Sequence, residues 1–174
     1  MTKSPYPRYV SPHQALAGFT KLRVIAALSL VIGATLILLA HAANPANATI
    51  NPTDITPVNW VGDIPGGSSA GGEATCVDGT NCDVFVITAG GTAADWSQKL
   101  IALNFSWGIP ASDFDFFIHK DSVTGPIVGT GRNDGAPATD DNAAIDPQAT
   151  GVGAYYVHIV YFTATNADPY HGTE

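Results

Sequence analysis

The chain has 174 residues, with fifteen Asp+Glu against seven Lys+Arg, and its formal net charge is −8. An acidic chain is repelled by nucleic acid and by anionic lipid, so the charge argues against both as partners. Glycine (18) and proline (12) are abundant while the hydrophobic share is 45%, which is typical of a turn-rich globular protein and not of a disordered one.

Residues 24–40 form an uncharged apolar run that follows all the basic residues of the N-terminal part, Lys3, Arg8, Lys21 and Arg23. A basic head, an apolar middle and the small residues of Ala40-His41-Ala42 are the three parts of a secretory signal. We therefore predict a signal peptide over residues 1–43, cleaved after Ala42 or Ala43. The alternative is an uncleaved anchor, because the run is almost long enough to cross a hydrocarbon layer of about 30 Å.

Export would change both the charge and the setting of the remaining chain. Without residues 1–43, the chain keeps 131 residues with three basic and fifteen acidic side chains, a formal charge of −12. Such a charge favours solubility or the binding of divalent cations. We expect a secreted or periplasmic protein, or, if the signal is not cleaved, a membrane-anchored one that faces outward.

Residues 44–74 are rich in proline and then in glycine and serine. Proline disfavours helix and central strand, and a Gly/Ser tract leaves the backbone free, so we predict a flexible spacer here. Trp60 is the exception in this stretch. We expect its ring to pack on the neighbouring domain.

Cys76 and Cys82 are the two cysteines of the chain. In an exported protein they are expected to form a disulfide, and the turn-forming residues between them, Asp78, Gly79 and Asn81, allow the sulfurs to meet. A redox pair or a metal-binding pair is the alternative, but a redox site usually spaces its cysteines by two residues and a metal site requires more ligands nearby.

From residue 82 onward, apolar residues recur with the period of a β-strand. The predicted strands cover residues 83–88, 99–107, 113–120, 126–130, 142–145 and 153–162, and residues 93–97 form one helical turn at most. The last of these strands is apolar on both faces, which is typical of a central strand. Many short strands separated by glycine and proline turns predict an all-β domain over residues 75–174, an antiparallel β-sandwich or jelly roll.

The alternation also predicts which side chains point into the core. On residues 99–107 the inward face holds Ile101, Leu103, Phe105 and Trp107. On residues 113–120 it holds Phe114, Phe116 and Ile118, with Asp113, Asp115, Phe117 and His119 pointing the other way.

Three of these strands resemble those of the bacterial pre-peptidase C-terminal domain: residues 82–85 (Cys-Asp-Val-Phe), 113–120 (Asp-Phe-Asp-Phe-Phe-Ile-His-Lys) and 153–160 (Gly-Ala-Tyr-Tyr-Val-His-Ile-Val). The resemblance spans roughly residues 75–165. It implies a β-sandwich attached to secreted hydrolases, often peptidases, that is not itself the catalyst and serves binding or targeting. Some relatives bind calcium.

The chain departs from this family after the strand at residues 153–160. Family members continue into a last strand, whereas only residues 168–174 (Asp-Pro-Tyr-His-Gly-Thr-Glu) stand there. The last strand is therefore predicted to be missing, short or supplied by another chain. An unpaired sheet edge would favour self-association or pairing with another chain.

Asp113 and Asp115 are two residues apart on one predicted strand, so their Cα atoms lie roughly 6.5 to 7 Å apart on the same face. Such a pair could hold calcium, which takes six to eight oxygen ligands. The residues expected to complete the shell are Asn133, Asp134, Asp140 and Asp141. The alternatives are a solvated acidic face and acid–base catalysis by paired carboxylates.

Histidine and tryptophan side chains provide the remaining candidates. His119 shares its outer face with Asp115, but no nucleophile elbow and no His-Glu-x-x-His motif accompanies it, and His158 is expected to be a hydrogen-bonded, partly buried histidine. Trp96, at a turn, is the candidate for stacking against a sugar ring or an extended peptide.

We therefore predict a non-catalytic, exported β-sandwich accessory module that binds or positions polypeptide or glycan, with calcium as a potential stabilising ion. A structural or assembly subunit that pairs through an exposed sheet edge is the alternative. A hydrolase with paired carboxylates is the third hypothesis.

Overall fold

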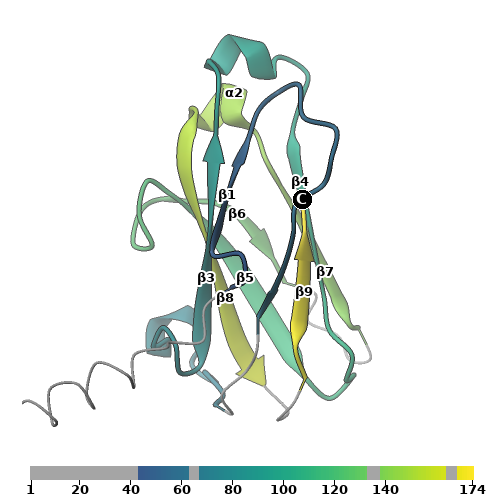
Figure 1. The fold of residues 1–174 in the computed structure, drawn as a ribbon. Coiled ribbons are helices and arrows are strands. Elements are labelled where there is room, and N and C mark those ends of the chain that lie inside the picture. Colours follow the sequence, from purple (N-terminus) through teal and green to yellow (C-terminus); the bar gives the residue numbers. More distant parts are fainter. Residues whose placement is uncertain (1–42, 63–66, 133–137, 164–167) are drawn as a thin grey trace, which may run out of the picture. The chain divides into compact units, whose positions relative to one another are not determined.

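Two facing β-sheets make up the part of the chain that a computed structural model describes, namely residues 43–62, 67–132, 138–163 and 168–174 (Figure 1). The predicted signal segment before Ala43 lies outside the described residues. One sheet has five strands in the order β1 (Asn47–Ile50), β3 (Cys82–Ala89), β8 (Gly153–Thr163), β5 (Asp113–Lys120) and β6 (Ile127–Gly131). The other has four, in the order β2 (Asn59–Gly62), β9 (Tyr170–Thr173), β4 (Ile101–Ser106) and β7 (Asp140–Ile145).

Neighbouring strands are antiparallel except for β1, which runs parallel to β3. The predicted all-β sandwich is thus confirmed, and each strand predicted from residue 82 onward is present. The apolar strand β8 occupies the middle of the five-stranded sheet, as its two apolar faces predicted. β7 lies at an edge of the other sheet.

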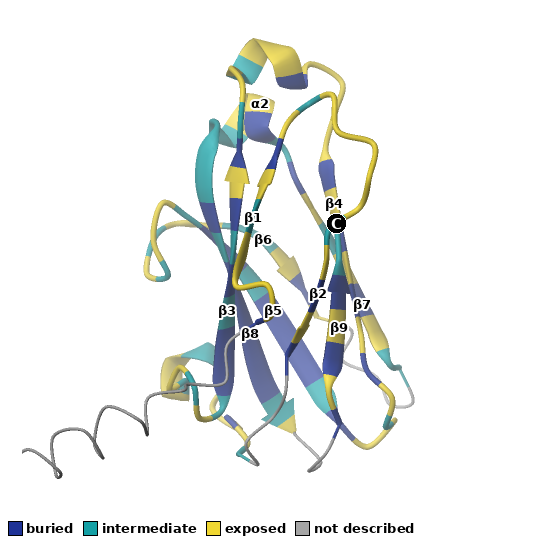
Figure 2. Ribbon diagram, viewed as in Figure 1, coloured by how far each residue is buried: buried dark blue, intermediate teal, exposed yellow. Residues whose placement is uncertain are grey.

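The core lies between the sheets and is made of the side chains predicted to point inward (Figure 2). On β4, buried and exposed residues alternate without a break, and Phe114, Phe116 and Ile118 of β5 are all buried. Phe105 packs against the rings of Phe114, Phe116 and Tyr170, with ring centroids 4.6 to 5.9 Å apart. Aromatic pairs at such distances add to the energy of burying their area.

The flexible spacer predicted for residues 44–74 is a wrong prediction, because this stretch supplies β1 and β2, one to each sheet. Its prolines do not prevent this, since Pro52 and Pro57 stand in the connection between the two strands and interrupt neither. Trp60 of β2 is 1% exposed and stacks on Phe85, with ring centroids 4.1 Å apart. The sandwich therefore includes residues 47–62 and does not begin at residue 75.

The last strand is present and short. β9 lies between β2 and β4, where Trp60 is opposite Gly172 in the register. A Cβ atom at residue 172 would come within 1.9 Å of the Trp60 ring, so glycine is required there. β9 pairs with β4 only from Asn104 to Ser106, which leaves Ile101–Leu103 without a strand on that side among the described residues.

Helical structure in the described ranges is limited to single turns: η2 (Gly72–Thr75), η3 (Ala93–Trp96) and α2 (Pro147–Thr150). The turn η3 is the one predicted for residues 93–97, and it is closed by a capping box between Thr92 and Asp95. None of the described helices is long and apolar enough to cross a membrane.

Candidate functional site

The carboxylates predicted to hold calcium lie on two elements. Asp113 and Asp115 are on β5, Asp140 and Asp141 are on β7, and Asn133 and Asp134 lie outside the described residues. Asp115 is 3% exposed, and its carboxylate lies 3.4 Å from Nε of Arg132. Asp141 is also buried, whereas Asp140 is exposed.

Among the described residues, these aspartates do not form a group of three whose oxygens lie within 4.8 Å of one another. One alternative was that these aspartates form a solvated acidic face. Asp115 does not fit that alternative, because it is buried and paired with Arg132. Calcium binding at this set stays a prediction.

Replacing Asp115 tests this part of the site. We expect Asp115→Ala to lower the free energy of unfolding by about 1 to 3 kcal/mol, because a buried charged hydrogen-bonding group is removed. Thr130→Ala, at an exposed position on the adjacent strand β6, is the control and should cost less than about 0.5 kcal/mol. Denaturant titrations in calcium and in EGTA would test the metal directly. A loss at Asp115 that is equal in both would contradict a calcium shell at this residue.

Trp96, the predicted stacking residue, is 3% exposed, and its indole N–H donates to the carbonyl of Gly90 (2.9 Å). This corrects the expectation of an open ring at a turn. The turn η3 folds its tryptophan inward, so the ring forms part of the wall of a groove and not a free stacking platform.

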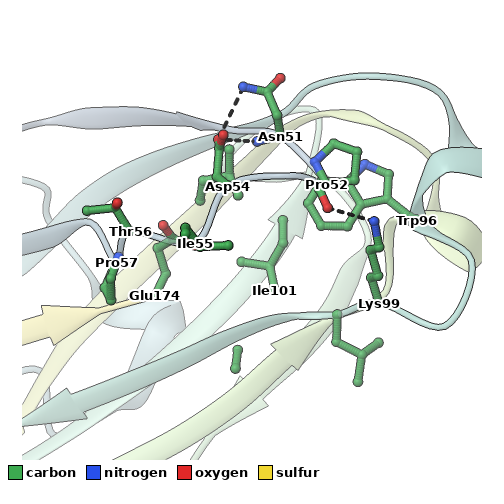
Figure 3. A pocket seen from close by; sticks show the side chains of 13 residues that line it. Asn51, Pro52, Asp54, Ile55, Thr56, Pro57, Trp96, Lys99, Ile101 and Glu174 are labelled. Atoms are coloured by element: carbon green, nitrogen blue, oxygen red, sulfur yellow. Dashed lines mark hydrogen bonds between the residues drawn. The ribbon is translucent and has the colours of Figure 1, made fainter.

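That groove, with a volume of about 420 Å³, lies beside the start of β4 (Figure 3). One wall is formed by the end of β1 and its connection to β2, residues 50–52 and 54–57, and the other by residues 99–102. Ile55 is 95% exposed and Leu100 is 59% exposed, so the groove presents two large apolar side chains to solvent. It coincides with the part of β4 that β9 does not cover.

Charged groups stand at both ends of the groove. Lys99 donates through Nζ to the carbonyl of Pro52 (2.7 Å), as Figure 3 shows. Glu174 lies near Asp54, and its pKa is raised by burial and further by the charge of Asp54, while the N–H of Val58 opposes this. Both acidic groups line the groove and would attract a cationic group of a ligand.

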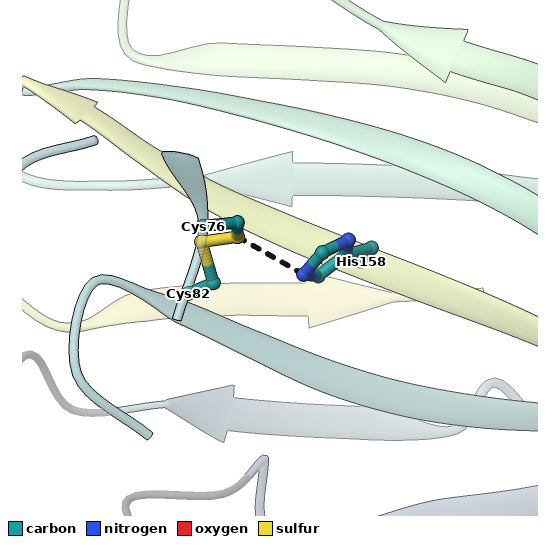
Figure 4. Close-up of side chains that lie close together, drawn as sticks. All are labelled: Cys76, Cys82 and His158. Carbon is teal, nitrogen blue, oxygen red and sulfur yellow. Dashed lines mark hydrogen bonds between the residues drawn. A yellow bond between two sulfur atoms is a disulfide. The ribbon is translucent and has the colours of Figure 1, made fainter. Parts of the chain in front are cut away.

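The disulfide between Cys76 and Cys82 is confirmed (Figure 4). It closes the loop that follows η2 and holds this loop against β8, where Sγ of Cys76 lies 3.0 Å from Nε2 of His158. Asp78 of the same loop lies 3.0 Å from the same nitrogen.

A cluster of ionisable side chains that the sequence analysis missed lies next to the disulfide. Glu73 from η2 meets His119 from β5 and His158 from β8, with Oε1 2.5 Å from Nε2 of His119 and 2.9 Å from Nδ1 of His158. His119 was considered as a partner of Asp115, but its carboxylate partner is Glu73, 46 residues away in sequence. Nothing in the sequence indicated this cluster, because Glu73 falls in the stretch predicted to be a spacer.

Comparisons with known proteins find similarity among solved structures. No family model and no curated protein matches the sequence. Among solved structures, the chain is similar to the pre-peptidase C-terminal domain of a collagenase from Bacillus anthracis, with 15% identity and a TM-score of 0.37 over 74% of this chain and 92% of that one. This domain bears the name of the family that the three strand motifs resemble.

Proposed function

We propose that the chain is an exported, non-catalytic β-sandwich module that binds an extended segment of polypeptide in the groove beside β4. The observation that supports this proposal is that β4 extends three residues beyond its pairing with β9, and two of these, Ile101 and Ala102, line the groove. A strand without a neighbour presents backbone donors and acceptors to an incoming strand. Main-chain hydrogen bonds then supply affinity, and alternate side chains supply specificity.

The groove walls indicate which polypeptide would fit. Ile55 and Leu100 provide exposed apolar contact area, and the buried Trp96 ring forms part of the wall. Asp54 and Glu174 add negative charge at one end. We therefore favour a segment with β-branched or other apolar residues at alternate positions and a lysine or arginine at one end.

The contacts of Ala43 support export. The backbone N–H of Ala43 donates to Oδ1 of the buried Asp83 (3.0 Å), and the Tyr170 hydroxyl donates to Oδ2 (2.6 Å). Cleavage after Ala42 would turn that N–H into an ammonium group beside a buried carboxylate. Asp83 would then gain the counter-ion that its burial calls for.

The sequence also suggested an assembly subunit, a glycan-binding module and a hydrolase. An assembly subunit would place a strand of a second copy beside β4. A glycan is a less favoured ligand, because the Trp96 ring is buried and is not exposed for stacking against a sugar. A hydrolase would need both Asp113 and Asp115, but Asp115 is paired with Arg132, which favours a structural role.

The groove can be tested with a fluorescein-labelled peptide that alternates valine and threonine and ends in lysine. We expect fluorescence anisotropy to show saturable binding, and Leu100→Asp to weaken it at least about tenfold, because a charge would replace apolar contact in the groove. Ile127→Asp is the matched control, since Ile127 is 52% exposed on β6 of the other sheet and should leave the affinity unchanged.

The same peptide with alternate backbone nitrogens methylated should bind much more weakly, because it cannot donate its ladder hydrogen bonds. Equal affinity for both peptides, or no effect of Leu100→Asp, would contradict strand addition at β4. Sedimentation analysis covers the assembly hypothesis: an oligomer of the native chain that Leu100→Asp dissociates would identify a second copy as the occupant.

A further inference from the structure

Glu73, His119 and His158 converge on the outer face of the five-stranded sheet, on the side opposite its packed core. We propose that these three side chains bind a divalent metal ion, zinc by its ligand chemistry. The site is separate from the groove beside β4 and does not depend on the function proposed for that groove.

The sheet brings the two histidines together. β5 and β8 are antiparallel neighbours in which Phe117 is opposite His158 and His119 is opposite Tyr156. His119 and His158 are therefore diagonal neighbours on one face, with ring centroids 6.2 Å apart. Both rings are buried, and Glu73 reaches them from the turn η2 that covers this part of the sheet.

The ring nitrogens that do not face Glu73 each have an acceptor. Nδ1 of His119 lies 2.8 Å from the carbonyl oxygen of Gly125, and Nε2 of His158 lies 3.0 Å from Oδ1 of Asp78. Metal-bound histidines commonly donate their second N–H to a carbonyl or a carboxylate in this way. Such bonds fix the tautomer and leave a lone pair on the opposite nitrogen.

The number of N–H groups on the two imidazole rings favours a cation in this cluster. Each ring has an oxygen acceptor at both nitrogens, but a neutral imidazole carries only one N–H. With both rings neutral and donating to Gly125 and Asp78, two lone pairs would face Oε1 of Glu73. Positive charge between these three atoms removes the conflict, either as two further protons or as one metal ion.

The charges also balance for a metal ion. Glu73 and Asp78 carry two negative charges, which a divalent cation with two neutral histidines neutralises. Two imidazolium rings would do the same, but they would place two cations side by side in a buried cluster, which is costly. The metal satisfies the same groups while the rings stay neutral, as they must be to coordinate.

The donor set favours zinc. Two imidazole nitrogens and one carboxylate oxygen are ligands that zinc binds at about 2.0 to 2.2 Å, with water in a fourth position. Hard cations such as calcium prefer six to eight oxygens, which the cluster does not offer. The three donor atoms lie within 4.8 Å of one another, so modest side-chain movement brings them to bonding distance.

The disulfide beside the site contributes to its geometry. It anchors the loop that carries Asp78 and follows directly after η2, so both carboxylates approach the histidines from one fixed segment. In the oxidised state the sulfurs of Cys76 and Cys82 are not thiolates, which are the form that coordinates metal. Binding must therefore be measured without reductant.

Zinc titration of the exported chain, stripped with EDTA and free of reductant, tests the proposal. We expect calorimetry to find one zinc ion per chain, and His119→Gln and His158→Gln each to weaken binding more than about 100-fold, since each removes a ligand. Asp78→Asn removes only the outer carboxylate charge and should weaken binding about 10- to 100-fold. Cobalt substitution should give visible absorption bands that both histidine variants lose.

His171→Gln is the matched control, because His171 lies exposed on β9 of the other sheet and should leave zinc affinity unchanged. Circular dichroism of each variant in EDTA separates loss of a ligand from loss of the fold, and Glu73→Gln, on the surface turn η2, provides a third ligand variant. Absence of zinc binding by the native chain would overturn the proposal. So would native affinity in the folded His119→Gln and His158→Gln variants.

Discussion

Trp60→Ala is expected to lower the free energy of unfolding by about 3 to 5 kcal/mol, the range for removing a large aromatic side chain from a core. The indole is 1% exposed, stacks on Phe85 and lies over Gly172, so its removal leaves a cavity that backbone on one side and a ring on the other cannot readily fill. Urea denaturation followed by far-ultraviolet circular dichroism measures the loss.

Ile55→Ala is the control, because Ile55 stands in the same proline-rich stretch but is 95% exposed, and its replacement should cost less than about 0.5 kcal/mol. The contrast tests whether residues 44–62 belong to the sandwich. Equal and small losses for the two variants would contradict the placement of β2 in the four-stranded sheet.

The second large effect is expected at Asp83, and it depends on whether the chain has been cleaved after Ala42. In the cleaved chain, Asp83→Asn should cost about 3 to 5 kcal/mol, because it removes one partner of a buried ion pair with the ammonium group of Ala43. In a chain extended before Ala43, the same substitution should change the free energy of unfolding by less than about 1 kcal/mol, because asparagine still offers an acceptor and carries no charge to bury.

The pH dependence of stability should differ between the two forms. In the extended chain, burial raises the pKa of Asp83 above its ordinary value of 3.8, although hydrogen bonds from Tyr170, Val84 and Ala43 lower it. A raised folded-state pKa means that this contribution to stability is complete below 3.8 and is lost as the pH rises through the folded-state pKa. Asp83→Asn should therefore remove a fall in stability with rising pH.

In the cleaved chain, the ammonium group favours the charged carboxylate, so the contribution of Asp83 should instead be retained at neutral pH and lost in acid. Denaturant titrations of the two forms across the acid range measure both slopes. Mass spectrometry of the exported protein identifies its first residue. A first residue other than Ala43, or equal losses for Asp83→Asn in both forms, would contradict this pairing.

The sequence predicted the part of the fold that depends on local alternation. Phe114, Phe116 and Ile118 are buried because apolar residues two apart share a face, and this period is visible without any structure. The disulfide was equally accessible, since Cys76 and Cys82 flank a short turn-forming segment. The signal peptide predicted for residues 1–43 also depends on a local pattern, and it stays a prediction.

Prediction failed where a residue's role depends on strands far away in the chain. The short strands β1 and β2 have four residues each and lie between prolines, so their own sequences favour a spacer, and only pairing with β3 and β9 makes them strands. Residues 44–62 therefore join the sandwich only through contacts with distant strands. In the sequence, only Trp60 indicated that this stretch packs on the domain.

The candidate sites show the same division. Asp113 and Asp115 were recognisable as a pair on one strand, but that Asp115 is enclosed against Arg132 follows only from the folded structure. Glu73, His119 and His158 are separated by 46 and 39 positions in the sequence and share no motif. The pairing of β5 with β8 and the position of η2 bring them together.

The amino-acid sequence by itself determined the strands β3 to β8, the inward faces of β4 and β5 and the disulfide, because hydrophobic alternation and short loop closure act between near neighbours. The tertiary structure decided that the proline-rich stretch completes both sheets, that Trp96 is buried, that β9 leaves the start of β4 open and that two histidines meet one glutamate. Each of these depends on contacts between segments distant in the chain, which no local pattern encodes.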